Sequence, residues 1–266
     1  MKKLIYIILL SIIITSCEKE IDFQYRSIDK LYVIEGLLSN ETIKVAITKT
    51  QDMGNVVGVN EFIDGVVVSI LSDDGNFETL QYEDGYYISP SGFTGEVGKS
   101  YTLSVSIDDD VFVSQSTMNK QTQIDSIHFR WMNILGERLL ICVLEIPDIP
   151  EEENYYCYYM YRNGERYRWS LLSDKGSENT VIKEYITCML ENGEMHEEDT
   201  LKDGDEITIE VRTIDRRTFD YLYSLMLSNR TSSNPLKNFS GECLGYFSAH
   251  SVVRKSTIFY FNDINQ

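Results

Sequence analysis

The chain has 266 residues, of which 42 are acidic and 24 are basic, and its formal net charge at pH 7 is −18. Nucleic-acid phosphates and anionic lipid headgroups are bound by lysine and arginine, so this balance excludes nucleic-acid binding and membrane adhesion by charge alone. A solvated acidic surface is expected, with cation binding or a basic partner as the alternative. Tyrosine is abundant at 18 residues, which suits half-buried strands.

The first 16 residues have the parts of an export signal. Lys2 and Lys3 precede an apolar run over residues 4–14, and two small residues follow it. This run is too short to span a bilayer, which takes about 20 apolar residues. The sequence therefore predicts a cleaved signal peptide over residues 1–16. Its removal would leave 22 basic residues against 42 acidic ones.

Cysteine follows the apolar run directly. Ile14-Thr15-Ser16-Cys17 resembles the lipobox of bacterial lipoproteins, in which the cysteine is acylated and becomes the new N-terminus. The resemblance implies a lipid on Cys17, and two or more acyl chains anchor a protein stably. Residues 17–28 are then a polar tether, and Glu18-Lys19-Glu20 resembles the surface-export signals of Bacteroidota lipoproteins. The expected location is the outer membrane, with the protein exposed at the cell surface.

Residues 29–122 alternate between short apolar–polar strands and turns. Asp-Gly between two alternating segments is a strong hairpin signal. Turns are expected at Asp74-Gly75, at Asp84-Gly85 and at residues 108–110. Turns at such regular spacing predict an immunoglobulin-like β-sandwich of about seven strands.

A polar connector, "NKQTQIDS", separates this half from a second β-rich domain over residues 123–266. Its most aromatic segment is a hairpin that turns at Asn163-Gly164. Near the end the period changes, because apolar residues recur at steps of three and four over residues 215–229. This pattern predicts one amphipathic helix with Asp215 or Thr218 as the N-cap. The fold class is therefore all-β, mainly strand with a single helix.

The aromatic hairpin is the best candidate for a ligand or partner surface. Tyrosine, tryptophan and arginine are enriched where binding energy concentrates in interfaces. The candidate residues are Tyr156, Tyr158, Tyr161, Arg162, Arg166, Tyr167 and Trp169. The alternative is a strand pair whose aromatic residues are covered by a neighbouring sheet.

Residues for catalysis or metal binding do not form a recognisable pattern. His128, His196 and His250 are scattered, and the sequence has neither HExxH nor GxSxG nor a phosphate-binding glycine loop. Acids at 151–153 and 197–199 would act as a glycosidase pair only across a cleft. We expect no catalytic residue, no metal and no cofactor.

Four cysteines remain after the lipid site, and their spacing matches no zinc motif. They are Cys142, Cys157, Cys188 and Cys243. An exported chain can oxidise them, and the three complete pairings stay open. Cys142 lies in an apolar run and is expected to be a buried thiol.

Gly241 and Gly245 predict a tight loop that enters a strand packed on the helix.

Several segments, each weak alone, occur in an order that resembles one family. They are "YVIEGLLSNE", "GVVVSILSDDGNFETLQYEDGYYISP", "YTLSVS", "QIDSIHF", "DIPEEENYYCYYMYRNG", "FDYLYSLM" and "GECLGYFSAHS". With the lipobox they resemble the Bacteroidota lipoproteins called domain of unknown function 4249 (DUF4249), over essentially the whole mature chain. "SGECLGYF" departs from the family, whose members often show an extra asparagine and glycine there.

The resemblance implies a function, because members are commonly encoded beside TonB-dependent outer-membrane receptors. It suggests a non-enzymatic accessory lipoprotein for nutrient uptake. A surface hydrolase of glycans or peptides, or a structural envelope or adhesion module, is the alternative.

Overall fold

A computed structural model describes residues 29–51, 61–149, 153–174, 181–190, 200–231 and 233–264. The predicted signal peptide, Cys17 and the tether lie outside the described residues, and so do His196 and the acids at 197–199. Leu31–Thr50 and Val59–Gln266 form one compact unit.

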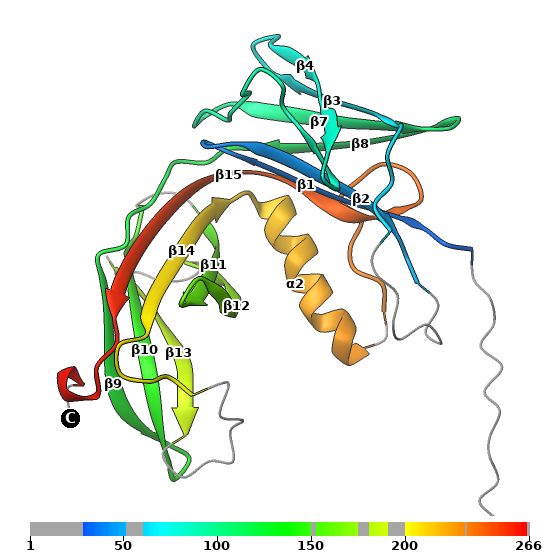
Figure 1. The fold of residues 1–266 in the computed structure, drawn as a ribbon. Helices are drawn as coiled ribbons and strands as arrows, with labels where there is room; N and C mark the ends of the chain where they lie inside the picture. Colours follow the sequence, from blue (N-terminus) through cyan, green and yellow to red (C-terminus); the bar gives the residue numbers. More distant parts are fainter. Residues whose placement is uncertain are drawn as a thin grey trace, which may run out of the picture. The chain divides into compact units, whose positions relative to one another are not determined.

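The protein is all-β with a single α-helix, as the sequence predicted (Figure 1). The described strands are β1 (Tyr32–Ser39), β2 (Ile43–Lys49), β3 (Val67–Ser72), β4 (Phe77–Thr79), β5 (Gln81–Glu83), β6 (Tyr86–Ile88), β7 (Ser100–Ile107), β8 (Asp110–Thr117), β9 (Ser126–Ile134), β10 (Glu137–Pro147), β11 (Tyr155–Arg162), β12 (Glu165–Ser173), β13 (Val181–Leu190), β14 (Glu206–Ile214) and β15 (Cys243–Ile258). The helix is α2 (Arg216–Thr231), and a short 3-10 turn, η3 (Phe261–Asp263), follows β15. No helix in this described part is long and apolar enough to cross a membrane.

The strands form three sheets. The largest has eight strands in the order β12-β11-β14-β15-β1-β2-β6-β5. A four-stranded sheet has the order β4-β3-β7-β8, and a three-stranded sheet has the order β13-β10-β9. Strand β15 is 16 residues long and pairs with β1 in parallel and with β14 in antiparallel orientation. It thereby joins the first half of the chain to the second.

One face of the eight-stranded sheet is covered by the two smaller sheets. At the β1–β2 end it packs on the four-stranded sheet, around buried residues such as Ile34, Leu103 and Phe247. At the β11–β14 end it packs on the three-stranded sheet, around residues such as Leu140 and Ile209. The expected division at residue 122 crosses the first of these cores, since Leu103 and Phe247 pack in the same cluster, and the large sheet also continues across it.

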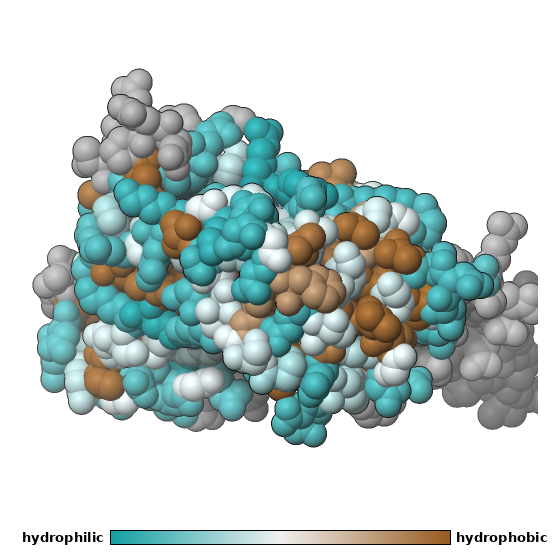
Figure 2. Space-filling view, turned by 90° about the horizontal axis from the view of Figure 1, so that it is seen from above, coloured by the Kyte–Doolittle hydropathy of each residue, from teal (hydrophilic) through white to brown (hydrophobic). Residues whose placement is uncertain are grey.

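The outer face of the four-stranded sheet is turned toward the viewer in Figure 2, where apolar groups stand among polar ones. Its exposed apolar residues are Val67, Leu71, Phe77 and Val111. The neighbouring outward positions on β7 hold serine and threonine. Such scattered apolar side chains are usual on a protein surface.

The predicted hairpin turns have the backbone that their residues favour. Type I′ turns need positive φ at both central residues. Asp84 and Gly85 have φ of 47° and 89°, and Asn163 and Gly164 have 51° and 84°. A further hairpin between β9 and β10 has Leu135 at a φ of 53°. Leucine rarely adopts this backbone conformation, so the turn was not predictable from the residue type.

The helix begins one residue after Asp215, which is its N-cap. The Oδ1 atom of Asp215 accepts a hydrogen bond from the backbone N–H of Thr218 at 2.7 Å. Its Oδ2 atom accepts from the hydroxyl of Ser116 at 2.7 Å and from the N–H of Thr117 at 3.0 Å. One carboxylate thus caps the helix and ties it to β8.

Replacing this carboxylate is expected to destabilise the fold. Asp215→Ala should lower the free energy of unfolding by about 3 kcal/mol, since a cap contributes about 1 kcal/mol and each further hydrogen bond a similar amount. Urea unfolding measures the change. Asp220→Ala, on the solvent side of the same helix, is the matched control and should change the value by less than about 0.5 kcal/mol. Equal effects of the two substitutions would refute the capping role.

Candidate binding site on the curved face of the large sheet

The second face of the eight-stranded sheet curves around α2 (Figure 1), and we call it the curved face. Residues of β11, β14 and β15 on this face form a third buried cluster with the helix. Tyr155, Cys157 and Tyr159 project into it from β11, and Tyr221 and Leu222 project from α2. Both faces of β11 are therefore covered.

This double covering corrects part of the predicted ligand surface. Tyr156 and Tyr158 have 0% and 3% of their surface exposed and lie in the core shared with the three-stranded sheet. The alternation along β11 sends one set of tyrosines to each face, as expected. No outward set results, because α2 covers the second face.

The other predicted residues have different surroundings. Tyr161 and Tyr167 are half-buried, and the hydroxyl of Tyr167 donates a hydrogen bond to the backbone oxygen of Cys188 at 2.6 Å. Arg162 forms an ion pair with Asp205, with Nε 2.7 Å from Oδ2. These three residues therefore support the sheet, and only Arg166 and Trp169 of the predicted set are exposed.

Arg166 and Trp169 meet at the ring of Tyr159. The Arg166 guanidinium lies 4.6 Å from the ring centroid, and Arg212 lies 4.4 Å from it. The ring of Trp169 stacks against the same tyrosine at 6.3 Å and 21°. Cation–π contacts of this kind stabilise by about 0.5–2 kcal/mol and hold the guanidinium in place. Arg166 forms no ion pair with any carboxylate in the described ranges.

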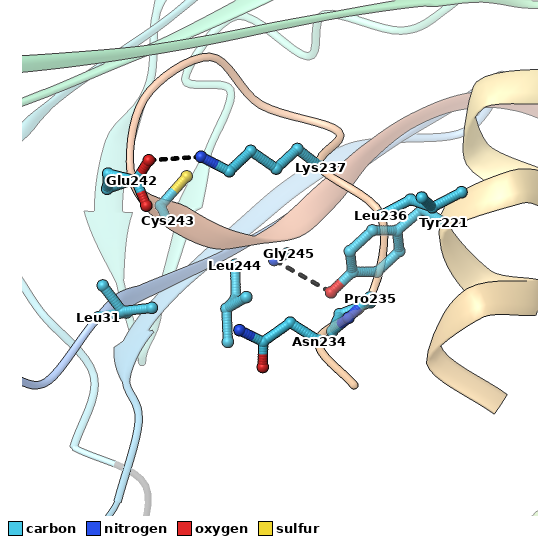
Figure 3. A pocket seen from close by; sticks show the side chains of 10 residues that line it. All are labelled: Leu31, Tyr221, Asn234, Pro235, Leu236, Lys237, Glu242, Cys243, Leu244 and Gly245. Atoms are coloured by element: carbon cyan, nitrogen blue, oxygen red, sulfur yellow. Dashed lines mark hydrogen bonds and ion pairs between the residues drawn. The ribbon is translucent and has the colours of Figure 1, made fainter. Parts of the chain in front are cut away.

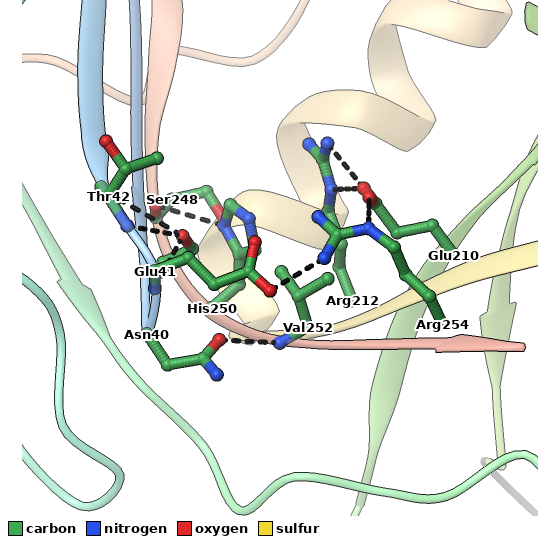
Figure 4. A network of polar contacts seen from close by, with 10 residues as sticks. Asn40, Glu41, Thr42, Glu210, Arg212, Ser248, His250, Val252 and Arg254 are labelled. Carbon is green, nitrogen blue, oxygen red and sulfur yellow. Dashed lines mark hydrogen bonds and ion pairs between the residues drawn. The ribbon is translucent and has the colours of Figure 1, made fainter. Parts of the chain in front are cut away.

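Arg212 belongs to a polar network that crosses the sheet (Figure 4). Glu210 is 5% exposed and lies between two guanidiniums. Its Oε1 atom accepts from Nε of Arg212 at 2.7 Å, and its Oε2 atom accepts from Nε of Arg254 at 2.7 Å. Arg254 also donates to Glu41 at 2.7 Å. Two cations and two anions balance, so the network is neutral in sum.

His250 lies beside this network and is buried (Figure 4). Its Nδ1 atom is 3.0 Å from the hydroxyl oxygen of Ser248. Burial, with the nearby positive charge of Arg212, lowers the pKa of His250 to about 3. The imidazole is therefore neutral near pH 7 and acts as a structural hydrogen-bonding group.

A further charged residue of the curved face is Glu35. Glu35 on β1 is paired in register with Tyr246 on β15, and Tyr246 stacks on Tyr221 of the helix at 5.3 Å. Glu35 stays accessible to solvent, yet burial of its carboxyl group raises its pKa, while the charge of Arg166 partly opposes the rise. Besides the Glu210 network, which is neutral in sum, the curved face thus carries Glu35 as a further negative group and Arg166 as a further positive group.

The raised pKa of Glu35 makes stability depend on pH. A folded-state pKa above the ordinary 4.5 means that the folded state holds the proton more tightly than the unfolded state does. The stabilisation that comes from this tighter proton binding is greatest below pH 4.5 and is lost as pH rises through the pKa that Glu35 has in the folded state. Glu35→Gln should match the parent protein at about pH 4 and exceed its stability at about pH 7 in urea unfolding. A difference that is the same at both pH values would contradict this environment for Glu35.

A small cavity and an open groove lie in the described part of the chain. A cavity of about 60 Å³ between α2 and the start of β15 (Figure 3) has room for a few water molecules rather than for a nutrient. Here the hydroxyl of Tyr221 accepts from the N–H of Gly245 at 3.0 Å. An open groove of about 460 Å³ lies at the tip of the four-stranded sheet, beside Phe77 and Glu78.

The four cysteines are buried free thiols, and Cys142 is a core residue as expected. Burial raises the pKa of Cys157 and of Cys243 to about 11. Thiols of this kind are unreactive near pH 7. Within the described ranges, no group of three or more His, Cys, Asp or Glu residues is placed to hold a metal ion.

Sequence reasoning missed Glu35, Glu210, Arg212 and Arg254. A signal was present in "EITIEVRTI", where Glu210 and Arg212 alternate with apolar residues inside a strand. Charges at alternate positions predict that one face of this strand is polar, and in the structure that face of β14 belongs to the curved face.

Comparison with known proteins agrees with the resemblance noted in the sequence. A family model described as "Domain of unknown function (DUF4249)" matches residues 18–256. No curated protein matches the chain.

Proposed function

The chain belongs to the DUF4249 family, and from this premise we propose that it is a lipid-anchored, surface-exposed lipoprotein of the outer membrane. In this proposal it is a non-enzymatic accessory subunit that captures a ligand for a TonB-dependent nutrient transporter. The frequent placement of family genes beside such receptors supports the partnership.

The anchor follows from the N-terminus. The lipobox at residues 14–17 would attach the chain to the membrane, and residues 17–28 would span at most about 40 Å when fully extended. A tether of this length keeps the protein close to a neighbouring receptor and raises their effective concentration. Pairing can then be stable even where the direct interface is small.

The capturing role is carried by one observation on the curved face. Arg166 and Trp169 are exposed side by side on the Tyr159 ring. Rings and guanidiniums held by their neighbours lose little conformational freedom on binding, which favours affinity. Exposed tryptophan and arginine are also the residues that contribute most to binding in interfaces.

A surface hydrolase is the alternative class of function. Glycoside hydrolysis needs two carboxyl groups about 5–10 Å apart, one of which acts as an acid or base. Glu210 on the curved face is held by two guanidiniums, which suits charge balance rather than proton transfer. Turnover of surface glycans or peptides by the purified protein would support this alternative. A structural envelope or adhesion module is the third possibility.

The anchor is tested by Cys17→Ala in the native host, grown with an alkyne-labelled fatty acid. The parent protein should take up the label and fractionate with the outer membrane. The variant should be unlabelled and should leave that fraction. A parent protein that stays unlabelled would overturn the lipid anchor.

A further inference from the structure

The charges of the curved face differ in how they are satisfied. Arg212 and Arg254 both donate to Glu210, so their charges are balanced within the sheet. Arg166 has the Tyr159 ring as its neighbour and no ion-pair partner among the described carboxylates. A guanidinium has five N–H donors in a planar fork that matches a carboxylate.

Glu35 is the negatively charged counterpart of Arg166 on this face. It is accessible to solvent, and none of the described lysines or arginines forms an ion pair with it. Three strands, β11, β14 and β15, lie between β12, which carries Arg166, and β1, which carries Glu35. Glu35 is paired with Tyr246, which shares a cluster with Tyr159, the ring under Arg166, so the two charges lie on the same face of the sheet. The charge of Arg166 also reaches Glu35, where it partly opposes the rise of the pKa.

Aromatic side chains line the interval between the charges. Tyr246 lies beside Glu35, and Tyr159 lies under Arg166. Both rings belong to the cluster under α2 and are almost fully buried. Trp169 is the accessible ring, with 39% of its surface exposed. The curved face therefore presents an anion, a cation and an apolar contact.

We propose that the curved face binds a zwitterionic ligand of short-peptide type, with its ammonium at Glu35, its carboxylate at Arg166 and an apolar side chain against Trp169. This names the ligand class for the capturing role and rests on that proposed function. A ligand with two negative charges would be repelled by Glu35, and a ligand with two positive charges would be repelled by Arg166. A neutral glycan would desolvate two charges without compensating either.

The test is calorimetric titration of the full-length lipoprotein in detergent with tri-leucine, N-acetyl-tri-leucine and tri-leucine amide. Tri-leucine should bind, and each blocked peptide should bind at least about tenfold more weakly, because it lacks one charge-assisted hydrogen-bonded contact. Equal affinity for all three peptides, or no binding of tri-leucine, would overturn the proposal.

Two variants assign the ends of the ligand. Arg166→Gln should weaken tri-leucine binding about tenfold and leave the amide unaffected. Glu35→Gln should weaken tri-leucine likewise and leave the N-acetyl peptide unaffected. Arg168→Gln, on the same strand but over the ring of Tyr167, is the matched control and should bind as the parent does. Variants that lose affinity for free and blocked peptides alike would count against the assignment.

Failure of this proposal is distinguishable from failure of the accessory role. Co-purification of a receptor with a protein that ignores tri-leucine would overturn the ligand class alone. Peptide binding by a protein that co-purifies with no receptor would instead overturn the accessory role and leave the ligand class standing.

Discussion

Gly245→Ala is expected to lower the free energy of unfolding by more than about 4 kcal/mol, or to prevent folding. Gly245 is the residue of β15 opposite Ile34 in the parallel pairing with β1. A Cβ atom at position 245 would lie 1.9 Å from the backbone oxygen of Ile34. Its φ of +107° is also one that side-chain-bearing residues rarely adopt. The strands would have to separate where the two halves of the chain meet.

The matched control is Gly164→Ala in the hairpin between β11 and β12. Gly164 has a φ of +84°, but an added Cβ there would meet nothing within 4 Å. Only the backbone penalty of about 1–2 kcal/mol applies. Thermal and urea unfolding should therefore separate the two variants clearly. Similar losses for both would show that the close approach of β15 to β1 is not what requires glycine at 245.

The second large effect is expected at Glu210. Glu210→Gln should lower the free energy of unfolding by about 3–5 kcal/mol, because removing one partner of a buried ion pair leaves the other charge uncompensated. Arg212 would bear most of this cost, since only 16% of its side chain is exposed. Urea unfolding at neutral pH gives the change.

Two further variants test this explanation. Glu41→Gln removes the half-exposed end of the same network and should cost less than about 1 kcal/mol. The double variant Glu210→Leu with Arg212→Leu should recover much of the lost stability, because it removes both buried charges. A double variant that is no more stable than Glu210→Gln would contradict the uncompensated charge as the cause.

Features encoded by a few neighbouring residues were predictable from the sequence. Positive φ at Asp84-Gly85 and Asn163-Gly164 follows from the residue types, and these turns are confirmed. The helix was predicted at 215–229 and lies at Arg216–Thr231, because its apolar period and its Asp215 cap are both local signals.

The pairing of β15 with β1 was not predictable in the same way. Its residues are far apart in the sequence, and alternation says only that each segment is a strand. The apolar face of β15 serves two cores, with Phe247 in one and Val253 packed against the other. Two β-rich halves were therefore expected, and one continuous sheet between them was not.

The candidate site was predictable only in part for the same reason. Arg166 and Trp169 belong to the hairpin that residue types singled out. Glu35 lies in a strand from the other half of the chain and becomes relevant only through the order of the large sheet. The burial of Tyr156 and Tyr158 depends on a core formed with the three-stranded sheet, and alternation within β11 cannot reveal which partner covers each face.

The accessory role is tested most directly by purifying the tagged protein from native outer membranes in mild detergent and identifying the co-eluting proteins by mass spectrometry. Cys17→Ala serves as the control for anchoring. The proposal predicts a TonB-dependent receptor in stoichiometric amount with the parent protein and its loss with the variant. A parent protein that elutes without such a receptor would contradict the partnership.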